Sequence, residues 1–364
     1  MSVLRTLSVM ISGCALLAAV WALGTPAQPN AADAADATPV RQAAASLESL
    51  PDPHTPDFIQ RPRSQSASER TFRSGSWTEV GAQRPSLTNP RALRAARGDV
   101  FFRDQSEHQV YRYTLDGEHV RTYGEGRGVG PGQHMAVMGY GIASNGQVVV
   151  GDPRGRKISV FNEDGTVERS ERPDFGLIRL GVTSDDQIVT FGAPTSTVRF
   201  QSLSGGGHQE GEDLVRNPYE SIGLLDGGLR GDTQGGVIQF SFFYGYLIRW
   251  HGNGTIDYIR HMVGDYPPTP TEPAGGGTKR AVGRELRFRI NDVSIHDDEI
   301  HVLVIFLEPD ENRYVVDVYD LAAGDYRYSY EPPEPVRSLA ITGNHVIGGQ
   351  DTTFAVWDRS AIAE

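Results

Sequence analysis

"RGDVFFRDQSEHQVYRYTLDGEHV" (residues 97–120) and "NGQVVVGDPRGRKISVFNEDGTVE" (residues 145–168) follow one pattern. Five landmarks of the first stretch stand 48 residues before their counterparts in the second, as Val100 does before Val148. Within both stretches apolar and polar residues alternate as they do in strands, and glycines mark the turns. A fixed period of this length predicts a repeated unit made of β-strands.

The same landmarks recur along the rest of the chain. An apolar residue of the second strand returns in steps of 48, 40, 49, 63 and 46 residues, at Val100, Val148, Ile188, Val237, Ile300 and Val346. An aromatic residue of the third strand follows each of them, at Tyr113, Phe161, Phe200, Trp250, Tyr319 and Trp357. The longer intervals contain the insertions 263–285 and 308–313, which we expect in loops.

Six such units predict an all-β protein. A four-stranded antiparallel meander cannot bury both of its faces alone, but several meanders packed around an axis can. We therefore predict a six-bladed β-propeller of four-stranded antiparallel blades. The sixth unit ends too early for an outer strand, so "GSWTEVG" (residues 75–81) should close the ring beside "TFAVWD" (residues 353–358). Deleting residues 1–82 should then expose a sheet edge, whereas deleting residues 1–70 should change thermal stability little.

The second unit resembles an NHL repeat. Its sequence "GPGQ" (residues 130–133) followed by "IASNGQVVVGDPRGRKISVFNEDGT" (residues 142–166) matches the typical order of glycines, strands and aspartates, and the first unit matches fairly well. The resemblance implies a propeller of a bacterial exported family whose functions are mostly uncharacterised. It also implies that Asp104 and Asp152 tie the turns that follow them, rather than forming a catalytic pair.

The glycine-rich stretch "GEGRGVGPGQ" (residues 124–133) raises the question of a phosphate-binding loop. A dinucleotide-binding turn needs glycine at its sixth position, and here that position holds Val129 or Pro131 in the two possible registers. The residues that follow alternate like a strand and do not open a helix. We expect a connector that runs from the outer strand of the first unit to the inner strand of the second.

The N-terminal part of the chain predicts export. Residues 1–24 carry Arg5 and then a long apolar run ending in small residues, which indicates a signal peptide. The only cysteine, Cys14, lies in this run, so a lipoprotein leader is an alternative, as is an uncleaved anchor. Residues 25–70 are rich in Ala, Pro, Ser and Asp and predict a disordered tether, which leaves residues 71–364 for the propeller. The expected location is the periplasm or the cell surface, with membrane contact only through an uncleaved or lipidated leader.

Composition and motifs restrict the chemistry. The net charge of -12 argues against nucleic acid as a partner, because such binding needs a surplus of Lys and Arg. The ten histidines stand singly without metal-ligand spacing, and no Gly-x-Ser-x-Gly motif occurs. We therefore predict no catalytic residue, no metal and no cofactor.

One set of residues suggests a site. The position nine residues before each second-strand landmark, where the inner strand begins, is arginine in three of the six units, at Arg91, Arg179 and Arg337. Arg230 lies two positions beyond the counted place in the fourth unit. These arginines either pair with carboxylates of neighbouring blades or form an anion-binding mouth of the central channel. The aromatic loop "SFFYGY" (residues 241–246) either lines the same mouth or packs against the next blade.

These features favour a binding or scaffold propeller that presents its channel face to an anionic small ligand, a glycan or an envelope protein. The alternative is an enzyme of the lactonase or lyase type with a metal in the channel.

Overall fold

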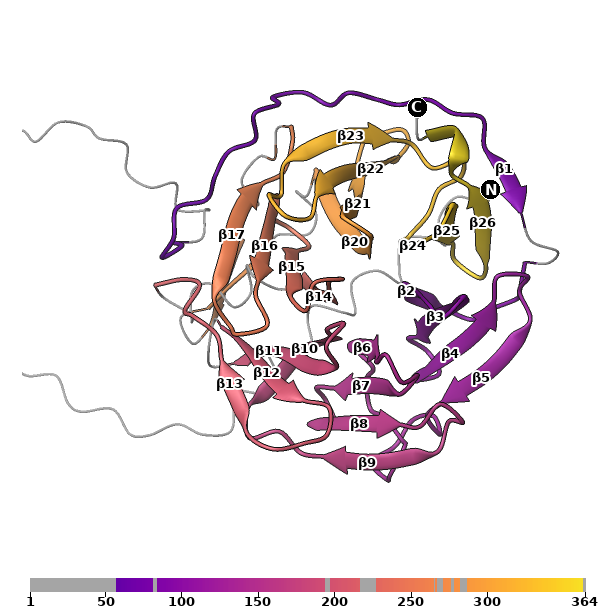
Figure 1. Ribbon diagram of the computed structural model, residues 1–364, viewed down its shortest axis with the longest axis vertical. Coiled ribbons are helices and arrows are strands. Elements are labelled where there is room, and N and C mark those ends of the chain that lie inside the picture. The colour runs from indigo at the N-terminus through magenta and orange to yellow at the C-terminus, as the bar shows by residue number, and fades with distance from the viewer. Residues whose placement is uncertain are drawn as a thin grey trace, which may run out of the picture.

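The computed structural model describes residues 57–80, 84–193, 197–216, 227–264, 266, 271–275, 278–281 and 287–362. Six four-stranded antiparallel sheets are arranged as blades in a ring (Figure 1). This confirms the predicted six-bladed β-propeller. The expected signal peptide, residues 1–24, lies outside the described residues.

Each of the first three blades is a meander that runs outward from the axis. Blade 1 consists of β2 (Pro90–Ala96), β3 (Asp99–Asp104), β4 (Gln109–Thr114) and β5 (His119–Tyr123). Blade 2 consists of β6 (Gly139–Ile142), β7 (Val148–Asp152), β8 (Lys157–Phe161) and β9 (Val167–Glu171). Blade 3 consists of β10 (Gly176–Val182), β11 (Gln187–Ala193), β12 (Val198–Ser202) and β13 (His208–Glu210).

The other three blades continue the ring. Blade 4 consists of β14 (Gly227–Gly231), β15 (Val237–Ser241), β16 (Tyr246–Trp250) and β17 (Ile256–His261). Blade 5 consists of β20 (Phe288–His296), β21 (Glu299–Phe306), β22 (Arg313–Asp320) and β23 (Tyr326–Tyr330). Blade 6 consists of β24 (Ser338–Thr342), β25 (His345–Gly349), β26 (Phe354–Asp358) and β1 (Thr78–Val80). A short hairpin, β18 (Thr271–Gly275) with β19 (Thr278–Ala281), lies in the insertion between blades 4 and 5, and η3 (Ser360–Ile362) follows β26.

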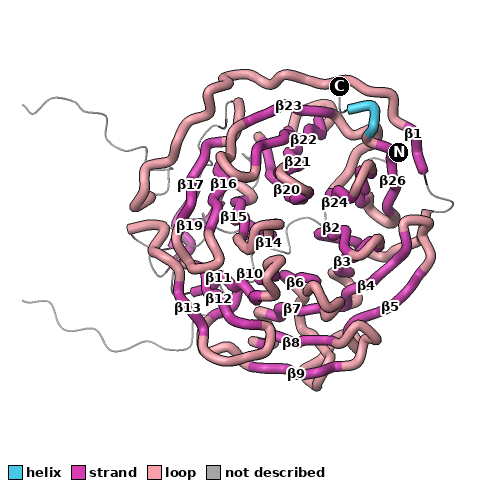
Figure 2. The backbone as a smooth tube through the Cα atoms, in the orientation of Figure 1, coloured by secondary structure: helices cyan, strands magenta, loops and turns pink. Residues whose placement is uncertain are grey.

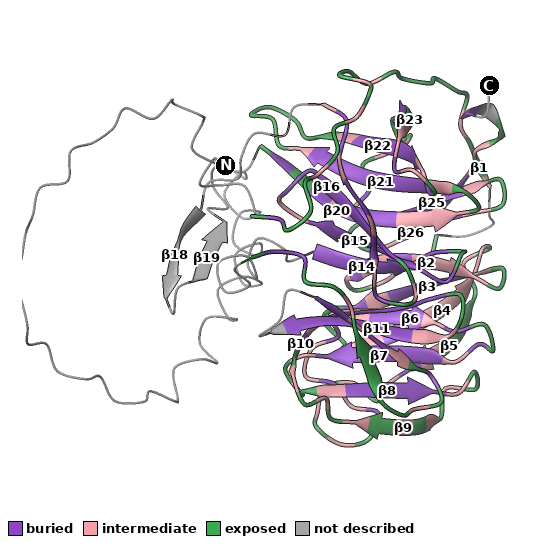
Figure 3. Ribbon diagram, turned by 60° about the vertical axis from the view of Figure 1, so that its left-hand side comes forward, coloured by how far each residue is buried: buried purple, intermediate pink, exposed green. Residues whose placement is uncertain are grey.

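The landmarks of the repeat are opposite residues in the sheets. Val100 is the Cα partner of Tyr113 in blade 1, and Val346 is the partner of Trp357 in blade 6. In blade 3 the register is shifted by one, because Phe200 lies opposite Val189. All of these side chains except the half-buried Tyr113 are buried between blades, as are most residues of the inner and second strands (Figure 3). The residues that repeat along the sequence are therefore those that pack one blade against the next.

The two aspartates at the ends of second strands fasten turns. The Asp152 carboxylate accepts hydrogen bonds from the amides of Gly155 at 2.8 Å and Met135 at 2.6 Å. The Asp104 carboxylate accepts bonds from the amides of Ser106 and Asn89, both at 2.8 Å. Each aspartate joins the turn after its strand to the segment that leads into the inner strand of the same blade, as the resemblance to NHL repeats implies.

The glycine-rich stretch is the expected connector between β5 and β6. The Glu125 amide donates to the Gly132 carbonyl at 2.8 Å, and the His134 amide donates to the Gly126 carbonyl at 2.9 Å. Gly126 has a φ of 83°, which a residue with a side chain rarely adopts. The connector ends at the fully buried His134, whose Nε2 lies 3.3 Å from the Ser159 hydroxyl.

The ring is closed by a strand from the N-terminal side. β1 pairs antiparallel with β26, and Glu79 lies opposite Trp357. Trp77, just before β1, packs against Tyr330 and Trp357 at ring-centroid distances of 5.7 and 6.5 Å. The predicted closure by residues 75–81 is thereby confirmed for β1.

The segment before β1 forms an arm around the outside of the ring (Figures 1 and 2). The Ile59 amide donates to the Leu214 carbonyl at 3.0 Å, and Phe58 is buried between blades 3 and 4. Further along the arm, Arg70 forms an ion pair of 2.8 Å with Asp317, whose side chain is fully buried in blade 5. Residues 57–70, which the sequence placed in the tether, thus pack on the blades. We therefore expect their deletion to lower the stability of the propeller.

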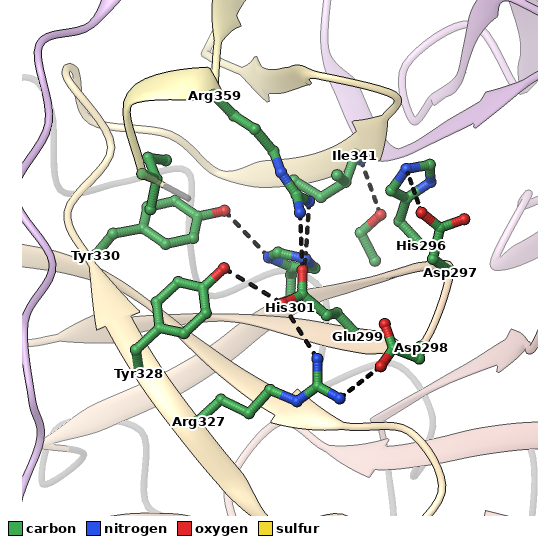
Figure 4. A network of polar contacts seen from close by, with 12 residues as sticks. His296, Asp297, Asp298, Glu299, His301, Arg327, Tyr328, Tyr330, Ile341 and Arg359 are labelled. Atoms are coloured by element: carbon green, nitrogen blue, oxygen red, sulfur yellow. Dashed lines mark hydrogen bonds and ion pairs between the residues drawn. The ribbon is translucent and has the colours of Figure 1, made fainter. Parts of the chain in front are cut away.

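A polar cluster fastens the C-terminal end of blade 6 to blade 5 (Figure 4). Arg359 donates to the Glu299 carboxylate at 2.9 Å, and the buried His301 lies 3.2 Å from the same carboxylate. Burial opposes the charge of Glu299, yet the hydrogen bond from His301 and the charge of Arg359 hold its pKa at about 2. Tyr330 lies 3.4 Å from the other ring nitrogen of His301, so the groups of this cluster are used in holding blades together.

We predict that the arm contributes several kcal/mol to stability. Deleting residues 1–70 removes Arg70 and leaves the buried Asp317 carboxylate without its counter-charge, a loss typically of about 3 to 5 kcal/mol. Urea unfolding should therefore show a lower free energy of unfolding than in the protein lacking only residues 1–56. Adding Asp317→Asn to the shorter chain should restore part of the loss, and equal stability of the two truncated proteins would contradict the role of the arm.

We predict that His134 makes stability sensitive to mild acid. Burial and the nearby charge of Lys157 lower the pKa of His134 to about 4, whereas an unfolded histidine has a pKa of about 6.5. Between these values only the unfolded chain takes up the proton, so the free energy of unfolding falls as pH falls, by up to about 3 kcal/mol. Unfolding measured from pH 7 to pH 4 should show a shallower fall for His134→Gln. Parallel curves for the two proteins would contradict this assignment.

Candidate functional site

Three of the six inner strands contain a β-bulge beside the axis. β2 has one extra residue between Arg91 and Arg94, where Ala92 adopts a φ of 54°. β10 has one before Arg179, and β20 has one before Asp292. A bulge changes which face of the sheet the following side chain points to, and bulges of this kind occur next to functional sites. Blades 1, 3 and 5 thus each place a charged side chain directly after a bulge.

The carboxylate of Asp292 links the inner strands of four blades. Only 1% of Asp292 is exposed, and its Oδ1 accepts a hydrogen bond from Arg230 of blade 4. Its Oδ2 accepts a bond from the Leu339 amide of blade 6 at 3.1 Å, and Arg94 of blade 1 lies 4.0 Å from Oδ1. Arg230 also donates to the Val293 carbonyl at 2.8 Å. This arrangement balances part of the positive charge at the axis.

Further arginines surround this carboxylate. Arg103 in β3 is the Cα partner of Arg91 and donates to the Val137 carbonyl of blade 2, but its buried Nε has no hydrogen-bond partner among the described residues. Burial and the positive charges of Arg179 and Arg91 lower the pKa of Arg103 to about 9. Blade 1 is opposite blade 4 in the ring, and the charge of Arg230 in blade 4 also contributes to lowering the pKa of Arg103.

The cluster is electrostatically unfavourable without a counter-ion. Burial and the charge of Arg230 lower the pKa of Arg94 to about 10, and burial and Arg337 lower the pKa of Arg91. All of these guanidinium groups remain charged at pH 7, so the lowered pKa values express the cost of holding the charges together. An anion bound among them would remove this cost.

The structure places the four predicted arginines differently. Arg91 is the second residue of β2, and its Nη1 bonds only to the Pro90 carbonyl at 3.0 Å. Arg179 in β10 is 7% exposed and donates to the Gly227 carbonyl of blade 4. Arg230 in β14 is committed to Asp292 and two carbonyls. Arg337 lies just before β24 beside Arg91, but forms an ion pair of 2.7 Å with Asp351.

Two counted positions hold glycine because there is no room for a side chain. A Cβ at Gly139 would lie 2.6 Å from the Leu180 amide nitrogen of blade 3. A Cβ at Gly228 would lie 2.3 Å from the ring of Phe240. The third non-arginine position, Asn291, is the extra residue of the bulge in β20, and it donates to the Arg337 carbonyl.

The sequence pattern did not identify Arg94, Arg103 or Arg289. Arg103 stands directly before the landmark Asp104, so counting from the end of the second strand would have found it. The direction of the Arg94 side chain depends on the bulge in β2, and the alternation of apolar and polar residues along the sequence does not reveal a bulge. Arg289, exposed in β20, lowers the pKa of Arg91 and lies over Phe242 at 5.4 Å.

The aromatic loop contributes to the same region. Phe242, between β15 and β16, lies under Arg179 at 5.5 Å as well as under Arg289. It also packs against the core between blades 4 and 5. The loop therefore both packs and holds guanidinium groups over an aromatic ring, an arrangement that favours cations.

The described part of the chain shows neither a metal centre nor a membrane-spanning helix. No group of three or more His, Cys, Asp or Glu side chains there is placed to hold a metal ion. Nor does this part contain a helix with the length and apolar character needed to cross a bilayer.

No family model matches the chain, and neither does any curated protein sequence. Among solved structures, a predicted exported protein from Bacteroides fragilis is 10% identical, with a TM-score of 0.52 over 81% of this chain and 97% of that one. A member of the DUF4221 family from Bacteroides vulgatus is 11% identical, with a TM-score of 0.54 over 80% of this chain and 98% of that one. Virginiamycin B lyase from Staphylococcus aureus is 10% identical, with a TM-score of 0.48 over 78% and 99%.

At these identities the two likenesses with TM-scores above 0.5 show the fold alone. The protein is a six-bladed β-propeller, and its axis is lined by arginines around a single buried aspartate, Asp292, in the described residues.

We predict that replacing arginine by glutamine has different effects on stability at Arg103 and at Arg230. Arg103→Gln should leave the melting temperature unchanged or raise it in anion-poor buffer, because it removes a buried charge that the charges of Arg179 and Arg91 destabilise. Arg230→Gln should lower stability by about 3 to 5 kcal/mol, because it leaves Asp292 buried without its ion pair. Thermal unfolding of both variants checks this, and a large loss in Arg103→Gln would mean that Arg103 serves the fold alone.

Proposed function

We propose that this protein is an exported binding propeller whose axis-facing arginines hold an anionic ligand. The observation that carries the proposal is Arg103, whose buried Nε lacks a partner in the described part of the chain and on which the charges of other arginines act. The chain has a net charge of -12, so a cluster of positive charges in one place is not explained by its composition. Guanidinium groups bind carboxylates, phosphates and sulfates through paired N–H bonds, so an anionic small ligand, a glycan or an acidic segment of an envelope protein fits this chemistry.

Export is part of the proposal. It rests on the apolar leader of residues 1–24 and on the NHL-like repeat of blade 2. One of the structurally similar proteins is itself a predicted exported protein. The packed arm from Asp57 onward would then follow the leader and the tether, and would hold the propeller at the end of that tether.

The alternative, a lactonase-like or lyase-like enzyme, requires a metal held by several acidic or histidine side chains at the axis. The charged groups that the described residues gather there are arginines with Asp292, whose oxygens already accept bonds from Arg230 and two backbone amides. Metal analysis of the purified protein would decide between the two functions, since a stoichiometric divalent ion would favour the enzyme.

We predict that anions stabilise the protein through this cluster. A thermal-shift panel of carboxylates, phosphates and sulfated sugars should contain anions that raise the melting temperature, whereas their neutral counterparts do not. The shift should shrink with added salt, because ions screen an accessible site, and it should be lost in Arg103→Gln. Replacing Arg91, Arg179 or Arg337 by Gln should each weaken binding by about 1.5 to 3 kcal/mol where a charged hydrogen bond is lost. A panel in which anions act no better than neutral compounds would refute the proposed function.

A further inference from the structure

We propose that the group bound beside Arg91, Arg103 and Arg179 is a tetrahedral oxyanion with two negative charges, such as the terminal group of a phosphate monoester. This inference rests on the proposed function and names the ligand chemistry of the same site. Neither the fold nor its likenesses to known structures assign it.

The directions from which the arginines come favour a tetrahedral group. Arg91 and Arg103 stand opposite each other on β2 and β3 of blade 1. Arg179 stands on β10, two blades further round the ring, and its charge acts on Arg103. The oxygens of a carboxylate accept hydrogen bonds mainly in one plane, whereas the terminal oxygens of a phosphate point in several directions. Donors on separate strands of two blades match the arrangement of phosphate oxygens better than that of carboxylate oxygens.

The donors available for such a group can be named. The Nε of Arg103 is buried and has no partner in the ranges that the structure describes. The Nη1 of the same side chain donates to the Val137 carbonyl, which fixes the guanidinium plane. Arg91 uses only Nη1, for its own neighbour Pro90, so its other N–H groups have no bond to any described residue. Two fixed cations with unused donors are therefore present on one blade before a ligand arrives.

The charge balance favours two negative charges over one. Among the described residues, the charged groups that act most strongly on Arg103 are Arg179, Arg91 and Arg230, all of them positive. Asp292, the buried carboxylate at the axis, already has Arg230 on one oxygen and the Leu339 amide on the other. A monoanion would compensate only part of the remaining positive charge, and the attraction between close charges grows with the charge of the ligand.

The test is calorimetric titration of the purified full chain at about pH 8, where phosphate is a dianion, at constant ionic strength in chloride. The probes are inorganic phosphate, glycerol phosphate, sulfate, malonate and acetate. We expect phosphate and sulfate to bind at least tenfold more tightly than malonate and acetate, in which each charged group is a planar carboxylate. Glycerol phosphate distinguishes the two sources of the group. If the ligand is a phosphate ester, glycerol phosphate should bind more tightly than inorganic phosphate. If the ligand is free phosphate, inorganic phosphate should bind more tightly.

Matched variants locate the site. Arg103→Gln and Arg91→Gln should each weaken phosphate binding roughly 10- to 100-fold, the loss expected for a charged hydrogen bond. Arg103→Lys, which keeps the charge but not the forked donor, should bind with intermediate affinity. Arg121→Gln, on the exposed outer strand β5 of the same blade, should bind like the unchanged protein. Circular dichroism of each variant confirms that it is folded.

Each other outcome overturns a defined part of the argument. Malonate binding as tightly as phosphate, with the same loss in Arg103→Gln, would overturn the tetrahedral dianion and leave the proposed function standing. Phosphate binding that is unchanged in both Arg91→Gln and Arg103→Gln would place the anion elsewhere and overturn this inference. Absence of binding by all the probes, together with no anion effect on melting temperature, would overturn both.

Discussion

The carboxylate of Asp292 is the point on which the centre of this structure depends. A propeller brings six inner strands to one axis. The hydrophobic core lies between neighbouring blades and not at the axis, so the inner strands need separate contacts with one another there. Asp292 accepts bonds from Arg230 of blade 4 and the Leu339 amide of blade 6, and it faces Arg94 of blade 1. One buried charge thereby ties its own blade to three others. The same charge permits arginines at the axis, because without it Arg94 and Arg230 would only repel each other.

The rim of the ring is held by different means. Blade 6 has no outer strand of its own from the C-terminal side, and β1 supplies it. The arm that leads to β1 adds hydrogen bonds to the outer strands of blades 4 and 5, through Arg63 beside Ile259 and Arg73 beside Ser329. Unpaired outer strands would otherwise present open edges, so the arm both closes the ring and covers part of its rim.

The sequence predicts the blades well because each blade repeats the same physical problem. An apolar residue of the second strand must lie opposite an aromatic residue of the third to fill the space between blades, so Val100 with Tyr113 and Val237 with Trp250 recur at nearly the same spacing. The arm could not be predicted in this way. Its composition is polar, and it is fixed by a few separate contacts, above all Phe58 and Arg70, that no periodicity connects. Composition alone therefore indicated a tether as far as residue 70.

The arginines near the axis could be found from the sequence only in part, for a related reason. Counting from strand landmarks finds residues that follow the regular geometry of a strand, and it found Arg91 and Arg179. It cannot find a residue whose direction depends on one extra residue in a bulge, as that of Arg94 does after Ala92. The bulges are local departures from regular pairing, and they occur where the charged groups approach the axis. The bulge before Asp292 serves the fold, because it precedes the carboxylate that links four blades. The like charges gathered around Arg103 cost stability, and the anion that we propose as ligand would offset this cost.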